Sequence, residues 1–299
     1  MASKGRMFAG LTVAMVTPFR DGEVDYKALR ELVEWQIGQG TPVISPVGTT
    51  GECPTLSHDE HERVIATVIE QAAGRAKVMA GTGSNATSEA IRLTKFAAKA
   101  GADAALLVSP YYNRPTQEGL YAHFARIAEA TDLPQVLYNV PSRTGRDVEA
   151  ETVERLCRLG PIVAIKEAGG SLDRVSDLAV RTDLTILSGD DSLTLPMMAV
   201  GAEGVVSVVA NIVPRDVMAQ VDAFREGNIA EARRIHQKLF PLCRDLLGLA
   251  SNPIPVKLAL ALLGRGNGEL RLPLLPPDES GIAALRKSLE RYGLLPSGS

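Results

Sequence analysis

A lysine follows a run of aliphatic residues in the segment G-P-I-V-A-I-K-E-A-G-G, residues 160–170. Such a run is typical of a strand that is buried on both faces, and we expect this strand to end at Lys166. The lysine is either an exposed residue that begins a loop or a desolvated amine at the end of a buried strand. Desolvation disfavours the ammonium form, and a neutral amine can attack a carbonyl carbon to form a Schiff base. Lys166 is therefore a candidate nucleophile.

Other polar residues near predicted strand ends would support Schiff-base chemistry. Tyr138 is either a packed tyrosine or the general acid and base that forms and breaks the imine. Thr49 and Thr50 lie in G-T-T-G-E, which is either a tight turn or a site where hydroxyls and backbone N–H groups bind a carboxylate. Arg143 is either a solvated side chain or a bidentate partner for a second carboxylate. In their functional readings these side chains suit a 2-oxo acid substrate.

Two adjacent tyrosines are candidates for a subunit interface, and two weaker motifs imitate a nucleotide site and a metal site. Tyr111 and Tyr112 follow Pro110, and we expect them to pack against another subunit rather than fold back on the rim. G-T-G-S-N-A, residues 81–86, imitates a dinucleotide-binding fingerprint, but it belongs to the third strand–helix unit. Cys53, His58 and His61 could suggest a metal site, yet no fourth ligand is evident. We expect neither a nucleotide nor a metal.

Eight short β-like runs alternate with helical patterns along the chain, which predicts parallel βαβ units. The expected strands span residues 11–16, 42–45, 77–80, 104–108, 135–138, 162–165, 185–187 and 204–208. The expected helices span residues 26–37, 59–73, 88–100, 117–130, 150–158, 172–180, 193–200, 215–225, 229–247, 256–263 and 280–292. Ser57 and Glu60 form a capping box at the second helix.

Eight such units in 299 residues favour an α/β fold, a closed (β/α)8 TIM barrel, over an open sheet. The helices after the eighth strand exceed what a barrel needs. We therefore expect a barrel domain over residues 1–225 and a C-terminal helical appendage over residues 226–299. In such barrels the site lies where strands end and βα loops begin, and every expected unit has small or polar residues there.

Composition narrows the function classes. Hydrophobic residues make up 45% of the chain and the net charge is −3, which suits a globular core and argues against nucleic-acid binding. No apolar stretch approaches the ~20 residues of a membrane span. The three cysteines form no evident disulfide framework, so we expect a cytoplasmic protein.

Several motifs together resemble a known family. In chain order they are G-T-T-G-E, P-Y-Y-N-R-P-T-Q-E-G-L, L-Y-N-V-P-S-R-T-G, I-K-E-A, L-S-G-D-D and N-P-I-P-V-K. This set resembles the pyruvate-dependent class I aldolase family that contains dihydrodipicolinate synthase and N-acetylneuraminate lyase, over roughly the whole chain. The resemblance implies a Schiff-base lyase that needs no cofactor or metal and assembles as a homotetramer, a dimer of dimers.

The resemblance also assigns roles to single residues. It implies that Lys166 condenses with pyruvate, and that Tyr138, Thr49 and Tyr112 relay protons, with Tyr112 donated across a subunit interface. The pyruvate-binding positions that it implies are Thr50, Gly189 and Val206. Arg143 in S-R-T-G matches the arginine that holds the carboxylate of L-aspartate 4-semialdehyde. This match favours condensation of pyruvate with that aldehyde, in lysine and diaminopimelate synthesis.

The family includes members that L-lysine inhibits at a dimer interface. The residues that match this regulatory site are His58, His61, Asn85, Glu89 and Tyr111. Cys53-Pro54 departs from the small residues expected there, and a proline removes a backbone donor. Two alternatives to the condensation stay open: cleavage of N-acetylneuraminate or a 2-keto-3-deoxy sugar acid on the same scaffold, and a non-catalytic family member. Arg143 favours the condensation over the first, and retention of the whole residue set argues against the second.

Overall fold

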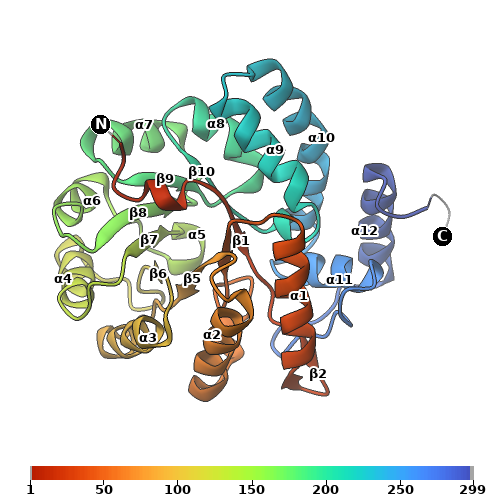
Figure 1. Cartoon of the computed structure of the whole chain (residues 1–299), viewed down its shortest axis with the longest axis horizontal. Coiled ribbons are helices and arrows are strands. Elements are labelled where there is room, and N and C mark those ends of the chain that lie inside the picture. The colour runs from red at the N-terminus through yellow and green to blue at the C-terminus, as the bar shows by residue number, and fades with distance from the viewer. Residues whose placement is uncertain (1, 297–299) are drawn as a thin grey trace.

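A closed barrel of parallel strands forms the centre of the protein (Figure 1). The computed structural model describes residues 2–296. The barrel strands are β1 (Gly10–Ala14), β4 (Val43–Ser45), β5 (Lys77–Gly81), β6 (Ala104–Val108), β7 (Gln135–Asn139), β8 (Ile162–Glu167), β9 (Thr185–Ser188) and β10 (Gly204–Ser207). Strand β1 closes the ring because it pairs in parallel with both β4 and β10. The predicted (β/α)8 TIM barrel is thus confirmed.

Helices between the strands cover the outside of the barrel (Figure 1). They are α1 (Tyr26–Gly38), α2 (His58–Ala72), α3 (Thr87–Ala100), α4 (Gln117–Ala128), α6 (Ala150–Leu156), α7 (Leu172–Arg181), α8 (Thr194–Ala199) and α9 (Pro214–Arg225). Side-chain caps define several of their starts: Ser57 and Glu60 form the predicted capping box of α2, and Thr116 caps α4. Each cap satisfies a backbone N–H that the first helical turn leaves without a partner.

The barrel strands are buried on both faces. Val136 and Ala164 belong to the apolar cluster inside the barrel, whereas Leu137 and Ile165 belong to the cluster between the barrel and its helices. Side chains two residues apart share a face of a strand. Lys166 therefore points in the same direction as Ala164, into the barrel.

Strands β7 and β8 extend one and two residues beyond their expected bounds of 135–138 and 162–165. β7 ends at Asn139 and β8 at Glu167, because these two residues continue the pairing register beyond Tyr138 and Lys166. The expectation that Lys166 is the last residue of its strand is wrong, because Glu167 also belongs to β8. Several short elements also lacked a periodic signal: β2 (Phe19–Arg20), β3 (Glu23–Val24), α5 (Pro141–Thr144), and the 3-10 helices η1 (Arg6–Phe8), η2 (Cys53–Thr55), η3 (Asp191–Leu193) and η4 (Val209–Asn211).

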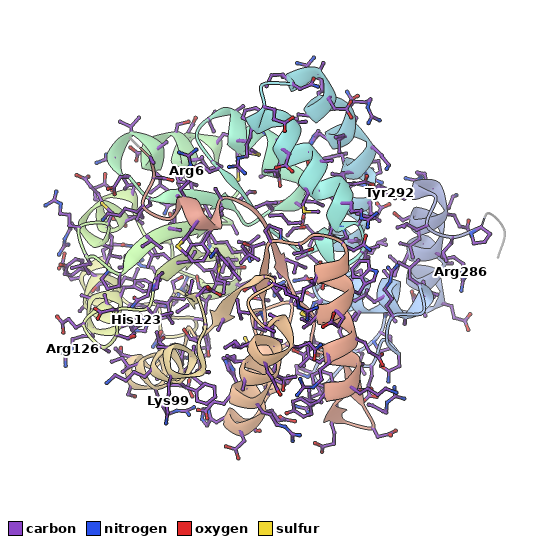
Figure 2. The ribbon with its side chains drawn as sticks, viewed as in Figure 1. Arg6, Lys99, His123, Arg126, Arg286 and Tyr292 are labelled. Carbon is purple, nitrogen blue, oxygen red and sulfur yellow. The ribbon has the colours of Figure 1, made fainter. Side chains whose placement is uncertain are left out.

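Three further helices follow the barrel: α10 (Ile229–Gly248), α11 (Ile254–Leu262) and α12 (Glu279–Tyr292). Helix α10 packs on α9 and α12, and Figure 1 shows α11 and α12 at one side of the barrel. Figure 2 labels Tyr292 at the end of α12; its hydroxyl donates a hydrogen bond to Asp216 of α9 over 2.5 Å. The predicted domain boundary between residues 225 and 226 falls in the turn between α9 and α10, and this division stays a prediction.

A buried ion pair connects α11 to the loop after β4. Lys257 Nζ lies 2.5 Å from Glu52 Oε1, and the two side chains are 3% and 0% exposed. Burial lowers the pKa of the Lys257 amine, and the carboxylate of Glu52 opposes this effect. Each charge depends on the other, because an unpaired charge at this depth is strongly unfavourable.

Replacement of Lys257 by methionine tests this mutual dependence. We expect Lys257→Met to lower the free energy of unfolding by about 3–5 kcal/mol, because the carboxylate of Glu52 stays buried without its partner. Urea denaturation at pH 7 measures the change. The matched control is Lys238→Met in α10, whose side chain is 46% exposed beside Asp216. The control should change stability by less than about 1 kcal/mol, and equal losses in the two variants would contradict the prediction.

Candidate active site

Lys166 and Tyr138 lie side by side at the mouth of the barrel. They are direct partners in the register of β7 and β8, and Lys166 Nζ lies 4.1 Å from the centroid of the Tyr138 ring. Both are buried, with 6% and 7% of their surface exposed. The Lys166 amine thus lies over the ring of Tyr138 within a shielded site. This is the arrangement that imine formation with a nearby proton donor requires.

Gly189 and Val206 belong to the two strand ends that follow in the barrel. A Cβ atom on Gly189 would lie 3.1 Å from Lys166 Cε and 2.7 Å from Ala168 Cβ. Glycine at this position therefore lets the backbone approach the lysine stem. Val206 is fully buried in the interior cluster that also contains Tyr138. The structure thus brings four of the predicted site residues to one end of the barrel interior.

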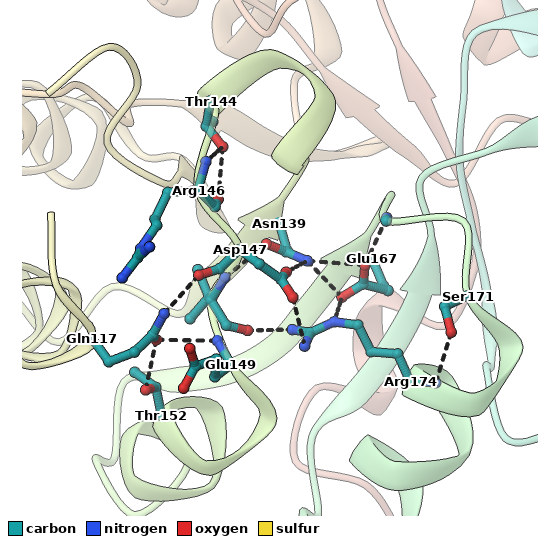
Figure 3. A network of polar contacts seen from close by, with 12 residues as sticks. Gln117, Asn139, Thr144, Arg146, Asp147, Glu149, Thr152, Glu167, Ser171 and Arg174 are labelled. Atoms are coloured by element: carbon teal, nitrogen blue, oxygen red, sulfur yellow. Dashed lines mark hydrogen bonds and ion pairs between the residues drawn. The ribbon is translucent and has the colours of Figure 1, made fainter. Parts of the chain in front are cut away.

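A buried polar network lies behind Lys166 and Tyr138, on the outer face of the same strands (Figure 3). Asn139 Nδ2 donates to both carboxylate oxygens of Glu167, over 3.0 and 3.1 Å, and to Asp147 Oδ1 over 2.7 Å. Arg174 Nε donates to Glu167 Oε2 over 2.7 Å. Figure 3 shows Glu167 between Asn139 and Arg174. Because Asn139 and Glu167 directly follow Tyr138 and Lys166, the network holds the backbone on which the site residues stand.

The glycines after Glu167 have a structural reason within this network. The backbone N–H of Gly169 donates to Glu167 Oε1 over 2.7 Å, and a Cβ on Gly169 would lie 2.7 Å from that same oxygen. Gly170 has φ +76°, a backbone conformation that residues other than glycine rarely adopt. The E-A-G-G sequence therefore folds the chain back so that its own backbone satisfies the buried carboxylate.

Asp191 connects the loop after β9 to the end of β10. Its carboxylate accepts hydrogen bonds from the Ser207 hydroxyl and from the backbone N–H groups of Val208, over 2.9 Å, and Val209, over 3.3 Å. Burial raises the pKa of this carboxyl to about 6, against the effect of the three donors. Asp191 lies between Gly189 and the end of the strand that contains Val206, so it ties two predicted binding positions together.

Thr49 and Arg143 line a cavity of about 200 Å³ at the same end of the barrel, together with Asn252. Asn252 Nδ2 donates to Thr50 Oγ1 over 3.0 Å, and Arg143 donates from Nη2 to the backbone oxygen of Asn252 over 3.3 Å. Arg143 lies in the short helix α5 rather than in a loop. Asn252 therefore contacts both residues that were predicted to bind carboxylates.

Tyr112 lies apart from this group within the chain. Its side chain is 91% exposed, and its backbone has φ +72°, which is uncommon for a residue with a side chain. Tyr111 is 38% exposed, and its backbone oxygen accepts a hydrogen bond from Asn85 Nδ2 over 3.2 Å. Tyr112 thus points into solvent within the single chain, whereas Tyr111 is partly covered by its own chain.

Four of the predicted regulatory residues lie in one cluster. His58 Nε2 lies 3.2 Å from Glu89 Oε1, and Glu89 also accepts a hydrogen bond from the Ser84 hydroxyl. Ser84 contacts the side chain of Tyr111, whose phenol pKa is raised chiefly by burial. Asn85 joins the same group through its bond to the Tyr111 backbone.

His61 is buried beside this cluster. Its Nε2 lies 2.8 Å from the carbonyl oxygen of Gly81, and burial lowers the pKa of its ring. The imidazole is therefore neutral at pH 7, and its contact with the backbone shows that it helps to fix α2 against the end of β5.

Packing accounts for the motif that imitates a dinucleotide fingerprint. A Cβ on Gly83 would lie 2.3 Å from the backbone nitrogen of Val108, so the glycine allows β6 to approach closely. In the part of the chain that the structure describes, no three His, Cys, Asp or Glu side chains form a group that could hold a metal ion. Within residues 2–296, no helix is both long and apolar enough to cross a membrane.

Sequence reasoning missed several residues that support the site. Glu167 and Asn252 belong to the motifs I-K-E-A and N-P-I-P-V-K, which the sequence analysis names. Their place in these motifs could have indicated that they lie near the candidate site. Arg174 lies on an amphipathic helix, and Asp147 in a loop, where charged residues are ordinary. Only their positions opposite Glu167 and Asn139 reveal their function in the network.

A closed (β/α)8 barrel with a buried lysine beside a tyrosine at the strand ends is typical of Schiff-base-forming aldolases. The chain belongs to the Dihydrodipicolinate synthetase family, whose model matches residues 7–292. The match confirms the resemblance that the motifs indicated.

Individual relatives agree over nearly their whole lengths. A 4-hydroxy-tetrahydrodipicolinate synthase of Pelobacter propionicus is 55% identical over 291 residues, which cover 97% of this chain and all of the relative. A chloride-inhibited dihydrodipicolinate synthase of Acinetobacter baumannii, solved in complex with pyruvate, superposes with a TM-score of 0.93 at 46% identity, covering 96% of this chain and 99% of that one. The enzyme of Cyanidioschyzon merolae with lysine bound has a TM-score of 0.94 at 41% identity, covering 97% and 99%.

The raised pKa of Asp191 predicts a specific pH dependence of stability. The unfolded carboxyl ionises near pH ~4, whereas the folded one stays protonated up to about pH 6. Its contribution to stability is therefore complete below pH ~4 and is lost as the pH rises through about 6. We expect the free energy of unfolding, relative to Asp191→Asn, to fall by roughly 3 kcal/mol between these limits. Denaturation of both proteins across this range measures the difference, and a difference that stays constant or grows with pH would contradict the prediction.

Proposed function

We propose that the protein condenses pyruvate with L-aspartate 4-semialdehyde, the reaction of 4-hydroxy-tetrahydrodipicolinate synthase, through a Schiff base on Lys166. The observation that carries the proposal is the buried Lys166 amine 4.1 Å from the Tyr138 ring at the barrel mouth. Curated relatives with this name, such as the 55% identical protein of Pelobacter propionicus, support the choice of reaction. So does the pyruvate complex of the Acinetobacter baumannii relative.

The first half of the reaction needs an amine and a proton donor. Lys166 Nζ attacks the C2 carbonyl carbon of pyruvate, and the resulting carbinolamine loses water to give an imine. Loss of a proton from the methyl group then gives an enamine, because the imine nitrogen accepts the electron pair. Tyr138, whose ring lies 4.1 Å from Lys166 Nζ, supplies or removes the protons. Thr49 and Tyr112 extend this relay toward the solvent.

The second half joins the two carbon chains. The nucleophilic carbon of the enamine attacks the aldehyde carbon of the semialdehyde, and the aldehyde oxygen takes up a proton. The amino group of the new chain then attacks the imine carbon and displaces Lys166, so the product leaves as a ring and the free amine is restored. Arg143 supports this step as a partner for the semialdehyde carboxylate, because a guanidinium binds a carboxylate with two parallel hydrogen bonds.

Pyruvate is held by three positions around the lysine in this proposal. Thr50 donates its hydroxyl to the pyruvate carboxylate. The backbones of Gly189 and Val206 face the bound molecule, and the close approach of Gly189 to the stem of Lys166 supports this placement. Thr50 lies in the loop after β4, Gly189 directly after β9, and Val206 within β10, so each position comes from a different strand end, as is usual in barrel enzymes.

We also propose that the site is completed in a homotetramer, built as a dimer of dimers. The support is Tyr112, which is 91% exposed and held at φ +72° in the single chain. A side chain held this way is suited to enter a neighbouring subunit, where it joins the relay. The same face contains Tyr111 and the cluster around Glu89.

That cluster is the proposed binding site for L-lysine as an inhibitor. Glu89 supplies a carboxylate for an ammonium group, and His58, His61, Asn85 and Tyr111 lie around it. The lysine-bound structure of the Cyanidioschyzon merolae enzyme supports the ligand class. We further propose a cytoplasmic location, which the free thiols of Cys53, Cys157 and Cys243 support, because reducing compartments keep thiols unpaired.

Borohydride trapping tests the Schiff base directly. With pyruvate present, reduction should inactivate the enzyme irreversibly and leave a pyruvyl adduct on the peptide that contains Lys166. Lys166→Arg should show no adduct, because an arginine guanidinium does not form the imine. Peptide mass mapping measures the outcome. A folded wild-type protein that gains no adduct at Lys166 would exclude the proposed mechanism.

Arg143 distinguishes the proposed aldehyde from other aldehydes. We expect Arg143→Ala to reduce turnover of the semialdehyde at least about 100-fold, since a charge-assisted bidentate contact contributes roughly 3 kcal/mol. Borohydride trapping of pyruvate should change less than about twofold. The control is Arg126→Ala, which removes an exposed arginine paired with Glu129 on α4. Efficient cleavage of a sugar-derived 2-oxo acid by the wild type would favour another aldolase of this family.

A further inference from the structure

The C-terminal appendage contacts the substrate loop G-T-T-G-E at two places. Asn252 donates to the hydroxyl of Thr50 over 3.0 Å. Lys257 lies 2.5 Å from Glu52, and the other oxygen of Glu52 accepts the backbone N–H of Arg271 over 3.2 Å. The contacting residues are more than 200 positions away in the sequence, so only the folded chain brings them to this loop.

Glu52 closes the turn that presents Thr49 and Thr50. Its backbone N–H donates to the carbonyl oxygen of Thr49 over 3.1 Å, and its backbone has φ +53°. A residue with a side chain adopts this left-handed conformation only when its surroundings enforce it. The side chain of Glu52 is buried and ends on Lys257 and Arg271, so the appendage supplies the enforcing contacts.

The amine of Lys257 contacts the carboxylate of Glu52 and the aromatic ring of Phe19. Its Nζ lies 4.1 Å from the centroid of the Phe19 ring, and the guanidinium carbon of Arg271 lies 4.4 Å from the same centroid. A buried ion pair of this kind is weak evidence for stability, because apolar residues of similar volume often serve as well. A pair that fixes the conformation of the G-T-T-G-E loop can instead contribute to binding, because it determines where the hydroxyls of Thr49 and Thr50 point.

We propose that Glu52 and Lys257 are positioning residues for Thr49 and Thr50, and that the C-terminal appendage is thereby a working part of the pyruvate site. This inference rests on the proposed function, because Thr50 is the proposed partner of the pyruvate carboxylate. Loss of the pair releases the turn without removing either threonine. The affinity for pyruvate should then fall, whereas the affinity for the semialdehyde, bound by Arg143, should not.

Four variants of the full-length chain separate positioning from general stability. They are Lys257→Met, Glu52→Gln, the double variant with both changes, and the control Lys238→Met. Steady-state kinetics give kcat and the KM of each substrate, and urea denaturation gives the unfolding midpoint. The double variant is decisive, because it contains no unpaired buried charge and yet lacks the pair.

We expect each single variant at the pair to raise the KM for pyruvate at least tenfold and to change the KM for the semialdehyde less than twofold. In the double variant the unfolding midpoint should return toward that of the wild type, while the KM for pyruvate stays high. Lys238→Met should leave both KM values unchanged. If the KM for pyruvate recovers together with the midpoint, or if both KM values rise in parallel, the pair has only a structural function and the inference is wrong.

A second measurement keeps this test independent of the proposed reaction. If the wild type turns over neither substrate, the proposed function fails, and hydrogen exchange of the peptide over residues 48–55 then tests the inference alone. Faster exchange in the double variant than in Lys238→Met supports the positioning function. Equal exchange in the two proteins contradicts it.

Discussion

The register between β7 and β8 is the constraint on which the site depends. It places Tyr138 opposite Lys166 inside the barrel and Asn139 opposite Glu167 outside it. Because successive side chains of a strand point to opposite faces, a shift by one residue would move the lysine out of the mouth and the carboxylate into it. One set of backbone hydrogen bonds thus determines both the proposed reactive pair, Lys166 and Tyr138, and the network that supports it.

Two buried carboxylates, Glu167 and Glu52, form ion pairs near the candidate site. Glu167 contacts Asn139 and Arg174 on the outer face of the strands, and Glu52 of the G-T-T-G-E loop contacts Lys257. Such groups lose water on folding, and their mutual attraction offsets this loss only when the geometry is well defined. These ion pairs therefore contribute chiefly by fixing the positions of the backbone segments that they join. Each ties a strand end or loop of the site to a helix outside the barrel, so that the mouth keeps its shape.

The C-terminal helices contact the candidate site, which their composition did not indicate. The sequence pattern places helices after the eighth strand that exceed what a barrel needs, and it marks N-P-I-P-V-K only as one of the motifs that resemble the family. In the structure Asn252 and Lys257 of this motif reach the loop after β4. The cavity that Thr49 and Arg143 line is also formed in part by Ser251, Pro273 and Leu274. The candidate site is thus shared between the strand ends and loops of the barrel and the last quarter of the chain.

The sequence by itself determined the barrel, its order of strands and helices, and the identity of the candidate nucleophile. These follow from local patterns: aliphatic runs, helical periodicity, capping residues and motifs at strand ends. It did not determine that β8 continues to Glu167, that Arg174 neutralises this carboxylate, or that Lys257 reaches Glu52. Such pairs join residues far apart in the chain, and a charged residue on a helix or in a loop has the same local pattern whether it faces water or a buried partner. Only the closed barrel decided which charges met, because it brings the ends of all its strands and the appendage to one face.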